Sequence, residues 1–174
     1  MPVGGKRRVK IPLATRMLDG PLGPIRVLHD SWPSVILQVD GPGLPTVRVP
    51  PDRDAKTVFV NGQRHPLQQP RPFALRRRSR RYSTTVDGRV YVFAPRSFRS
   101  SQLLRDGIAV AEVRGTLAVY SPFHHLPGLD ARITWCGAPD PLDVALGQAL
   151  VIVFGAGSGG FLTNLVIGLV EFFN

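Results

Sequence analysis

The most constraining feature of this chain is an apolar segment at its C-terminal end. Residues 140–174 read DPLDVALGQALVIVFGAGSGGFLTNLVIGLVEFFN, and no charged side chain occurs between positions 144 and 170. The 174 residues together nevertheless carry a formal net charge of +10. An element that is apolar on every side is covered either by protein or by lipid, so the fold depends on what covers this segment.

The first half of the segment has the signals of a helix. Asp140 is a good N-cap, Pro141 suits the first helical position, and Asp143 lies in the first turn, where the helix dipole favours a carboxylate. The apolar run continues to Phe154, and the glycine-rich block 155–160 is expected to end the helix. A helix over residues 140–154 is about 22 Å long, which is shorter than the roughly 30 Å, or about 20 helical residues, that a bilayer core requires. We therefore expect a helix buried inside a shell of β-strands, with a C-terminal membrane anchor as the alternative.

The chain before this helix has the pattern of short strands. Apolar and polar side chains alternate in several runs, which is typical of half-buried strands. Asp-Gly and Asn-Gly dipeptides, which suit tight hairpin turns, recur about every 20 residues. We predict a mainly β protein, an antiparallel barrel or sandwich with an apolar C-terminal helix. The runs are Ile25/Val27, Val35/Leu37/Val39, Val47/Val49, Val58/Val60, Val90/Val92 and Leu117/Val119, and the dipeptides are Asp19-Gly20, Asp40-Gly41, Asn61-Gly62, Asp87-Gly88 and Asp106-Gly107.

The chain divides into three predicted parts. Residues 1–10 form a basic arm, residues 11–154 a β-rich domain with the C-terminal helix, and residues 155–174 an apolar tail that begins with the glycine block. The N-terminus is basic but lacks the apolar stretch of a secretory signal, so we expect a cytoplasmic location, free or at a membrane surface. Cys136 is the single cysteine; it excludes an internal disulfide, and we expect it in the core as a small hydrophobic residue.

Positive charge is concentrated in one run of arginines. The chain has 22 Lys and Arg against 12 Asp and Glu, and guanidinium groups suit phosphate and carboxylate partners. Closely spaced guanidiniums repel one another, so an anion bound beside them is stabilising. The alternative is a solvated, charged edge that prevents strand-to-strand aggregation. The predicted anion-binding residues are Arg76, Arg77, Arg78, Arg80 and Arg81, extended by Arg64, Arg71 and Arg89.

Three shorter motifs do not support catalysis or cofactor binding. The block 155–160 has the spacing G-x-G-x-x-G, but the chain ends too soon after it to complete a βαβ unit. Ser158 cannot serve as an esterase nucleophile in the usual order because no His follows it. His124 and His125 are adjacent, and adjacent strand residues point to opposite faces. We therefore predict no catalytic residue, no metal site and no cofactor.

One family resemblance extends these expectations. The strand pair around Asp106-Gly107-Ile108-Ala109-Val110-Ala111-Glu112-Val113, the strand at 131–135 and the helix opening Asp140-Pro141-Leu142 resemble the tubby-like C-terminal fold, which includes LURP-one-related and phospholipid scramblase-like proteins. The resemblance implies strands that close around the C-terminal helix and a non-enzymatic module that binds an anionic membrane surface or lipid. The alternative is a structural or assembly protein, with a basic patch for nucleic acid and an apolar tail that packs on a partner chain or a second copy.

Overall fold

The computed structural model describes residues 14–29, 37–50, 56–69, 81–115 and 128–156. Within these ranges eleven strands precede one helix. The predicted basic arm, 1–10, and the tail beyond Ala156 lie outside them. The strands are β1 (Ala14–Gly20), β2 (Gly23–His29), β3 (Leu37–Gly41), β4 (Leu44–Val49), β5 (Thr57–Val60), β6 (Gln63–Gln68), β7 (Tyr82–Val86), β8 (Arg89–Pro95), β9 (Ser100–Arg105), β10 (Ile108–Arg114) and β11 (Arg132–Trp135), and the helix is α1 (Pro141–Phe154).

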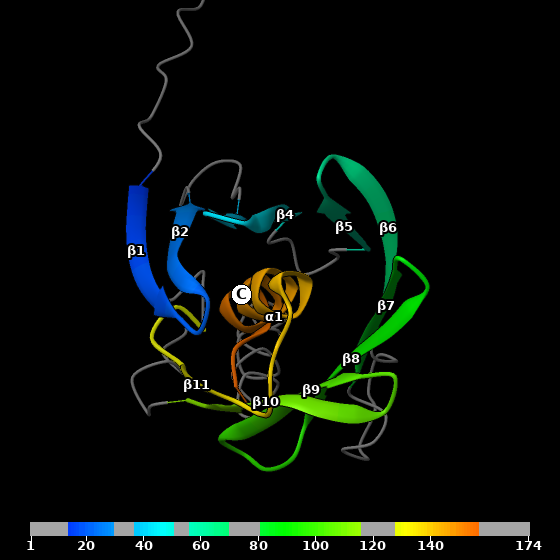
Figure 1. The fold of residues 1–174 in the computed structure, drawn as a ribbon. Coiled ribbons are helices and arrows are strands. Elements are labelled where there is room, and N and C mark those ends of the chain that lie inside the picture. The colour runs from blue at the N-terminus through cyan, green and yellow to red at the C-terminus, as the bar shows by residue number, and fades with distance from the viewer. Residues whose placement is uncertain (1–13, 30–36, 51–55, 70–80, 116–127, 157–174) are drawn as a thin grey trace, which may run out of the picture.

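The strands form one continuous antiparallel sheet that curves around α1 (Figure 1). Each strand pairs with the next along the chain, from β1 to β11. The described parts of β1 and β11 do not pair, so the sheet is an open barrel rather than a closed one. An ion pair between Arg16 of β1 and Asp130, just before β11, joins the two edges at 2.8 Å. The predicted class, mainly β with an apolar C-terminal helix, is confirmed.

Helix α1 begins and ends where its local signals predict. The Asp140 carboxylate accepts a hydrogen bond from the Asp143 N–H, and the Asp143 carboxylate accepts one from the Asp140 N–H, which makes a reciprocal capping box. At the other end Gly155 adopts a φ of 73°, and its N–H donates to the carbonyl of Val151. This left-handed conformation favours glycine, so Gly155 provides the helix stop.

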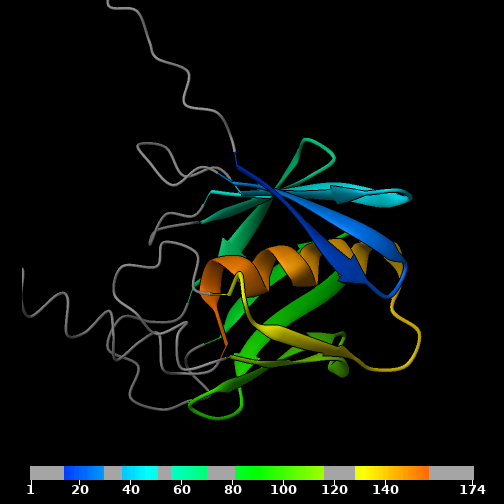
Figure 2. The same ribbon diagram turned by 90° about the vertical axis from the view of Figure 1, so that its left-hand side faces the viewer.

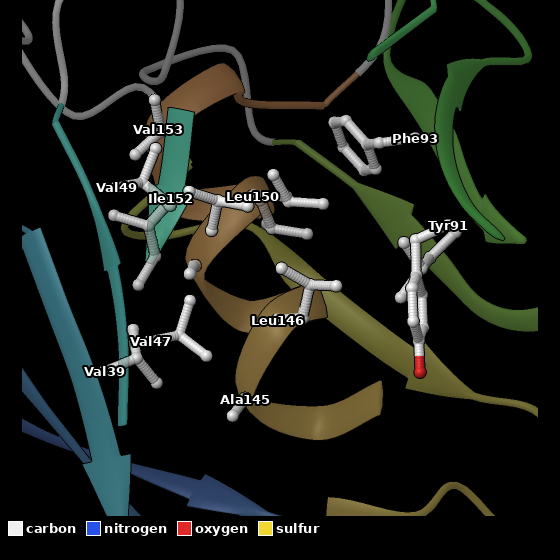
Figure 3. Packing of buried hydrophobic residues seen from close by; sticks show 14 of the residues in the cluster. Val39, Val47, Val49, Tyr91, Phe93, Ala145, Leu146, Leu150, Ile152 and Val153 are labelled. Carbon is white, nitrogen blue, oxygen red and sulfur yellow. The ribbon is translucent and has the colours of Figure 1, made fainter. Parts of the chain in front are cut away.

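The strands surround the helix and cover its apolar side chains. Every residue from Asp143 to Val153 is buried, and α1 packs chiefly on β3 and β4 on one side and β10 on the other. Figure 3 shows Leu146, Leu150 and Ile152 among strand residues that point inward. Burying one large aliphatic side chain stabilises a fold by about 1.5–3 kcal/mol. The helix buries several such side chains, so its burial contributes much of the stability of the core. The strand side chains that line the core include Ile25, Val27, Leu37, Val39, Val47, Val49, Val58, Tyr91, Phe93, Leu103 and Val113.

Three of the five predicted hairpin turns lie where expected. Asn61, Asp87 and Asp106 have φ values of 49°, 51° and 50°, and each is followed by a glycine that also has a positive φ. Asn and Asp tolerate this region better than other side chains. Two of these side chains also bond the backbone of another strand. The Asp106 carboxylate accepts from the Val90 N–H of β8 at 2.8 Å, and the Asn61 amide oxygen accepts from the Thr46 N–H of β4 at 2.9 Å.

The other two turns are displaced from their predicted positions. Asp19-Gly20 and Asp40-Gly41 belong to β1 and β3, and the chain reverses two residues later, at Pro21-Leu22 and Pro42-Gly43. Proline presets the φ of the first central turn residue, and Gly43 supplies a φ of 72° at the second. Proline therefore overrides the preceding Asp-Gly signal in both hairpins.

Two predictions of burial are wrong. Val90 and Val92 do not face the core; Val90 is 45% exposed, while Tyr91 and Phe93 of the same strand are buried. Cys136 is half-buried and lies outside the core cluster. The predicted pair Leu117/Val119 lies outside the described residues. In the part of the chain that the structure describes, no helix is long and apolar enough to cross a membrane.

Candidate functional site

The two ends of the barrel differ in their connections. Because the strands alternate in direction, the hairpins β1–β2, β3–β4, β5–β6, β7–β8 and β9–β10 all turn at one end, where α1 begins. We call this the short-turn end. At the opposite end, where α1 ends, the chain enters and leaves the described ranges, at Ala14, His29, Leu37, Pro50, Lys56, Gln69, Arg81, Gly115, Gly128 and Ala156. Figure 2 shows the helix from the side, running from one end to the other. We call this second end the long-connection end.

Contacts with α1 establish which end is which. At the short-turn end Arg89 and Arg105 reach the helix N-terminus through ion pairs with Asp140. At the long-connection end the rings of Tyr82 and Phe154 stack, with centroids 3.7 Å apart. The Gly128 N–H there donates to the carbonyl of Ile152 at 3.0 Å.

Acidic side chains gather at the short-turn end. The described residues include eight Asp and Glu, and six of them lie in or beside the short turns or at the helix N-terminus. The two others, Glu112 and Asp130, each form an ion pair with an arginine. Among the described residues, the long-connection end therefore has no acidic cluster that would compete with an external anion. The six are Asp19, Asp40, Asp87, Asp106, Asp140 and Asp143.

A network of charged groups fixes the start of α1. The carboxylate of Asp143 is fully buried; it accepts from Arg105 at 2.6 Å and from the hydroxyl of Tyr91 at 3.0 Å. Arg105 also bonds Asp140, at 3.2 Å, and Arg89 pairs with the same Asp140 oxygen. Both carboxylates are thus engaged by guanidinium groups. This arrangement positions the helix and leaves neither carboxylate available as a general base.

The network shifts several pKa values. Burial raises the pKa of the Asp140 carboxyl, but hydrogen bonds from the Asp143 N–H and Arg89, with the charges of Arg89 and Arg105, outweigh it and hold that pKa below its usual value. Burial, the largest cause, raises the pKa of the Tyr91 hydroxyl. Tyr91 therefore stays protonated and donates to Asp143. The hydrogen bond to Asp140, with smaller contributions from Tyr91, raises the pKa of Arg89.

Arginines at the long-connection end face outward on β10 and β11. Arg114 lies directly opposite Arg132 in the register of these strands, and both side chains are exposed. Neither has a carboxylate partner among the described residues. Arg99 and Arg81 are also exposed at this end. Glu112, two residues before Arg114, accepts instead from Arg96 at 2.8 Å. These guanidiniums are suited to phosphate or carboxylate groups outside the chain.

The structure separates some of the arginines that the sequence groups together. Arg81 is exposed at the long-connection end, immediately before β7. Arg89 lies beyond the far end of β7 and pairs with Asp140; five strand steps of about 3.3 Å place it roughly 17 Å away along β7. Arg64 is the second residue of β6, near the short-turn end. Its side chain extends along the sheet, and its Nε donates to the hydroxyl of Thr57, the first residue of β5, at 3.4 Å. The predicted residues Arg71, Arg76, Arg77, Arg78 and Arg80 lie outside the described residues.

Sequence reasoning missed the pair formed by Arg114 and Arg132. Each is an isolated arginine in the chain, and only the pairing of β10 with β11 brings them together. Only a correct prediction of the register between these two strands could have identified the pair from the sequence. In the described ranges, no group of three His, Cys, Asp or Glu side chains is arranged to hold a metal ion.

Comparisons with known proteins give no relative. No family model matches the chain, no curated protein matches it, and no solved structure matches it. Any functional conclusion therefore rests on the residues and their arrangement.

Proposed function

We propose that this protein is a non-enzymatic module that binds an anionic membrane surface through the long-connection end of its barrel. The observation that carries this proposal is the separation of charge between the two ends. Acidic groups gather at the short turns, and exposed arginines without carboxylate partners in the described chain lie at the other end. A molecule with such a dipole orients its positive end toward a negative surface.

The rest of the chain adds to this separation. The described residues contain 12 of the 22 Lys and Arg and 8 of the 12 Asp and Glu, so they contribute +4 of the net charge of +10. The remaining +6 belongs to segments that join the described residues at the long-connection end, and these include the arginine run 76–80. On an anionic leaflet each basic residue near the surface contributes about 1 kcal/mol. The excess is sufficient for measurable electrostatic binding.

Apolar groups accompany the charge at the same end. Phe98, in the β8–β9 connection, is 42% exposed and is next to Arg99. The apolar sequence 161–174 follows α1, which ends at this end. Basic residues beside apolar ones are typical of segments that lie at the membrane interface. The arrangement of strands around a C-terminal helix is also the one that the tubby-like resemblance implies, although a fold by itself does not determine function.

Vesicle flotation tests the proposal. The full-length protein is expected to float with phosphatidylcholine vesicles that contain about 30% phosphatidylserine, and to dissociate as the salt concentration rises, because salt screens surface charge. Pure phosphatidylcholine vesicles are the control. Absence of binding to the anionic vesicles would overturn the proposal. Salt-dependent retention of nucleic acid without vesicle binding would instead support the alternative, an assembly protein with a nucleic-acid surface.

A further inference from the structure

Arg114 and Arg132 form an unusual pair of like charges. They are directly opposite on neighbouring strands, and their neighbours Val113 and Ile133, also directly opposite, point toward the core. The two arginines therefore share the outer face. Side chains in such positions have Cβ atoms about 5 Å apart, and like charges there are destabilising.

The described residues around the pair do not neutralise it. Glu112 is two residues before Arg114 on the same face, but it is engaged by Arg96. Asp130 is two residues before Arg132, but it is engaged by Arg16. Ser100, which pairs with Arg114 from β9, and Thr134, which follows Arg132 on the outer face, are uncharged. Within the described ranges, the pairs Arg96–Glu112 and Arg16–Asp130 are each neutral, so the charges of Arg114 and Arg132 are left unbalanced. A group with two negative charges, bound between the two guanidiniums, would neutralise them.

We infer that Arg114 and Arg132 together bind one phosphomonoester group of a lipid headgroup. This inference rests on the proposed function and names the headgroup class that this part of the surface takes. A guanidinium is a planar fork that binds two oxygens at once, and two forks on one face can hold separate oxygens of one phosphate. A phosphomonoester carries a charge of about −1.5 to −2 near pH 7, which matches the pair better than a single carboxylate does.

A simpler role for these arginines gives a different expectation. β11 is an edge strand of the open sheet, and charged side chains on an edge prevent pairing with other chains. In that case lysine serves as well as arginine, and no phosphate is involved. The experiment therefore compares substitutions that keep the charge with substitutions that remove it.

The test uses the full-length protein and two sets of phosphatidylcholine vesicles with equal surface charge. One set contains a phosphatidylinositol bisphosphate, which has phosphomonoesters, and the other contains phosphatidylserine, which has none. The site variants are Arg114→Gln/Arg132→Gln and Arg114→Lys/Arg132→Lys. The control variant, Arg64→Gln, removes one charge from an exposed position near the short-turn end of β6 and is compared with the single variant Arg132→Gln. A further arm measures thermal stabilisation by inorganic phosphate, to separate a lipid headgroup from free phosphate.

We expect the double Gln variant to bind bisphosphate vesicles about 20-fold more weakly, since each contact contributes about a factor of five, and the control variant to lose less than about threefold. The Lys variant should also be weakened, because an ammonium does not bind two oxygens in this geometry. Equal losses in the Arg132→Gln and control variants, or full binding by the Lys variant, would overturn the site while the membrane proposal stands. Phosphate stabilisation that depends on both arginines, without binding to either vesicle, would support the phosphate site and overturn the lipid source. If the wild type responds to neither vesicles nor phosphate, both proposals are wrong.

Discussion

The hydroxyl of Tyr91 donates a hydrogen bond to the carboxylate of Asp143, with 3.0 Å between the two oxygens, although the residues are 52 positions apart in the chain. Tyr91 is fully buried on β8 and Asp143 is fully buried in the first turn of α1. The same carboxylate also accepts from Arg105 of β9 and from the N–H of Asp140. One side chain thus joins the helix cap to two strands of the surrounding sheet.

Asp143→Ala is expected to lower the free energy of unfolding by about 3–4 kcal/mol. The substitution leaves Arg105 with one fewer carboxylate, leaves the Tyr91 hydroxyl buried without its acceptor, and removes half of the capping box. Urea unfolding followed by circular dichroism measures the loss. Glu112→Gln, which breaks an exposed ion pair with Arg96, is the control and should cost less than about 1 kcal/mol. Similar losses in the two variants would contradict the role assigned to Asp143.

Stability is expected to decrease in acid partly through Asp40. The hydrogen bond from Arg26, at 2.7 Å, is the main cause that holds the pKa of the Asp40 carboxyl below its usual value of 3.8, against a smaller opposing effect of burial. A carboxyl with a lowered pKa stabilises the fold above its unfolded pKa. That contribution is lost as the pH falls through the folded pKa.

The corresponding measurement is urea unfolding of wild type and Asp40→Asn at several pH values below 6. The unfolding free energy of the wild type should decrease more steeply below the ordinary carboxyl pKa of about 4 than that of the variant. Asp140 has a lowered pKa too, so the variant should retain part of the slope. Identical slopes would show that the Arg26–Asp40 pair does not couple folding to pH.

The backbone contact of Gly128 predicts a further cost. A Cβ added there would overlap the carbonyl oxygen of Val151, which belongs to α1. Backbone of a buried helix cannot move aside cheaply, so Gly128→Ala should destabilise the fold by more than about 3 kcal/mol. Gly147→Ala, whose new methyl would meet Leu103 Cδ2 at 2.8 Å, is the milder comparison at about 1–3 kcal/mol. Thermal unfolding of both variants measures the difference, and equal melting temperatures would contradict it.

The central architecture could be predicted because its signals are local. Asp140, Pro141 and Asp143 specify the helix start within four positions, and Gly155 specifies its end. The absence of charge around the helix then requires a cover on all sides. The sequence did not show which face of strand β8 points toward the core, because Arg89–Pro95 has apolar side chains on both faces. Its inward face is decided by the Tyr91 contact with Asp143, which sequence periodicity does not contain.

The candidate site depended even more on tertiary structure. The run of arginines at 76–81 is visible in the sequence because its members are adjacent. Arg114 and Arg132 are 18 positions apart, and their proximity follows only from the register of β10 with β11. The separation of acidic and basic ends likewise needs the complete strand order, since Asp-Gly turns are distributed along the chain and converge only in the folded barrel.

The proposed orientation at a membrane predicts which exposed apolar residue meets lipid. Phe98 is 42% exposed at the long-connection end, and Ile108 is 69% exposed at the short-turn end, after Asp106-Gly107. An environment-sensitive fluorophore attached to Phe98→Cys, in a Cys136→Ser background, should shift to shorter wavelengths on anionic vesicles. The same label at Ile108→Cys is the control and should not shift. A shift at position 108 alone would reverse the orientation, and equal shifts would show that binding has no preferred end.

Removal of residues 157–174 separates the core from the predicted apolar tail. The described core cluster extends from Ile25 to Ala156, and the helix is capped by Gly155 before the cut. A chain that ends at Ala156 should therefore unfold cooperatively, with a sharp transition in urea. Because the removed sequence carries apolar residues and only one charge, Glu171, its loss should weaken vesicle binding more at high salt, where electrostatic attraction is screened. Aggregation with no cooperative transition would instead show that the tail belongs to the core, and unchanged binding at high salt would show that it does not contact lipid.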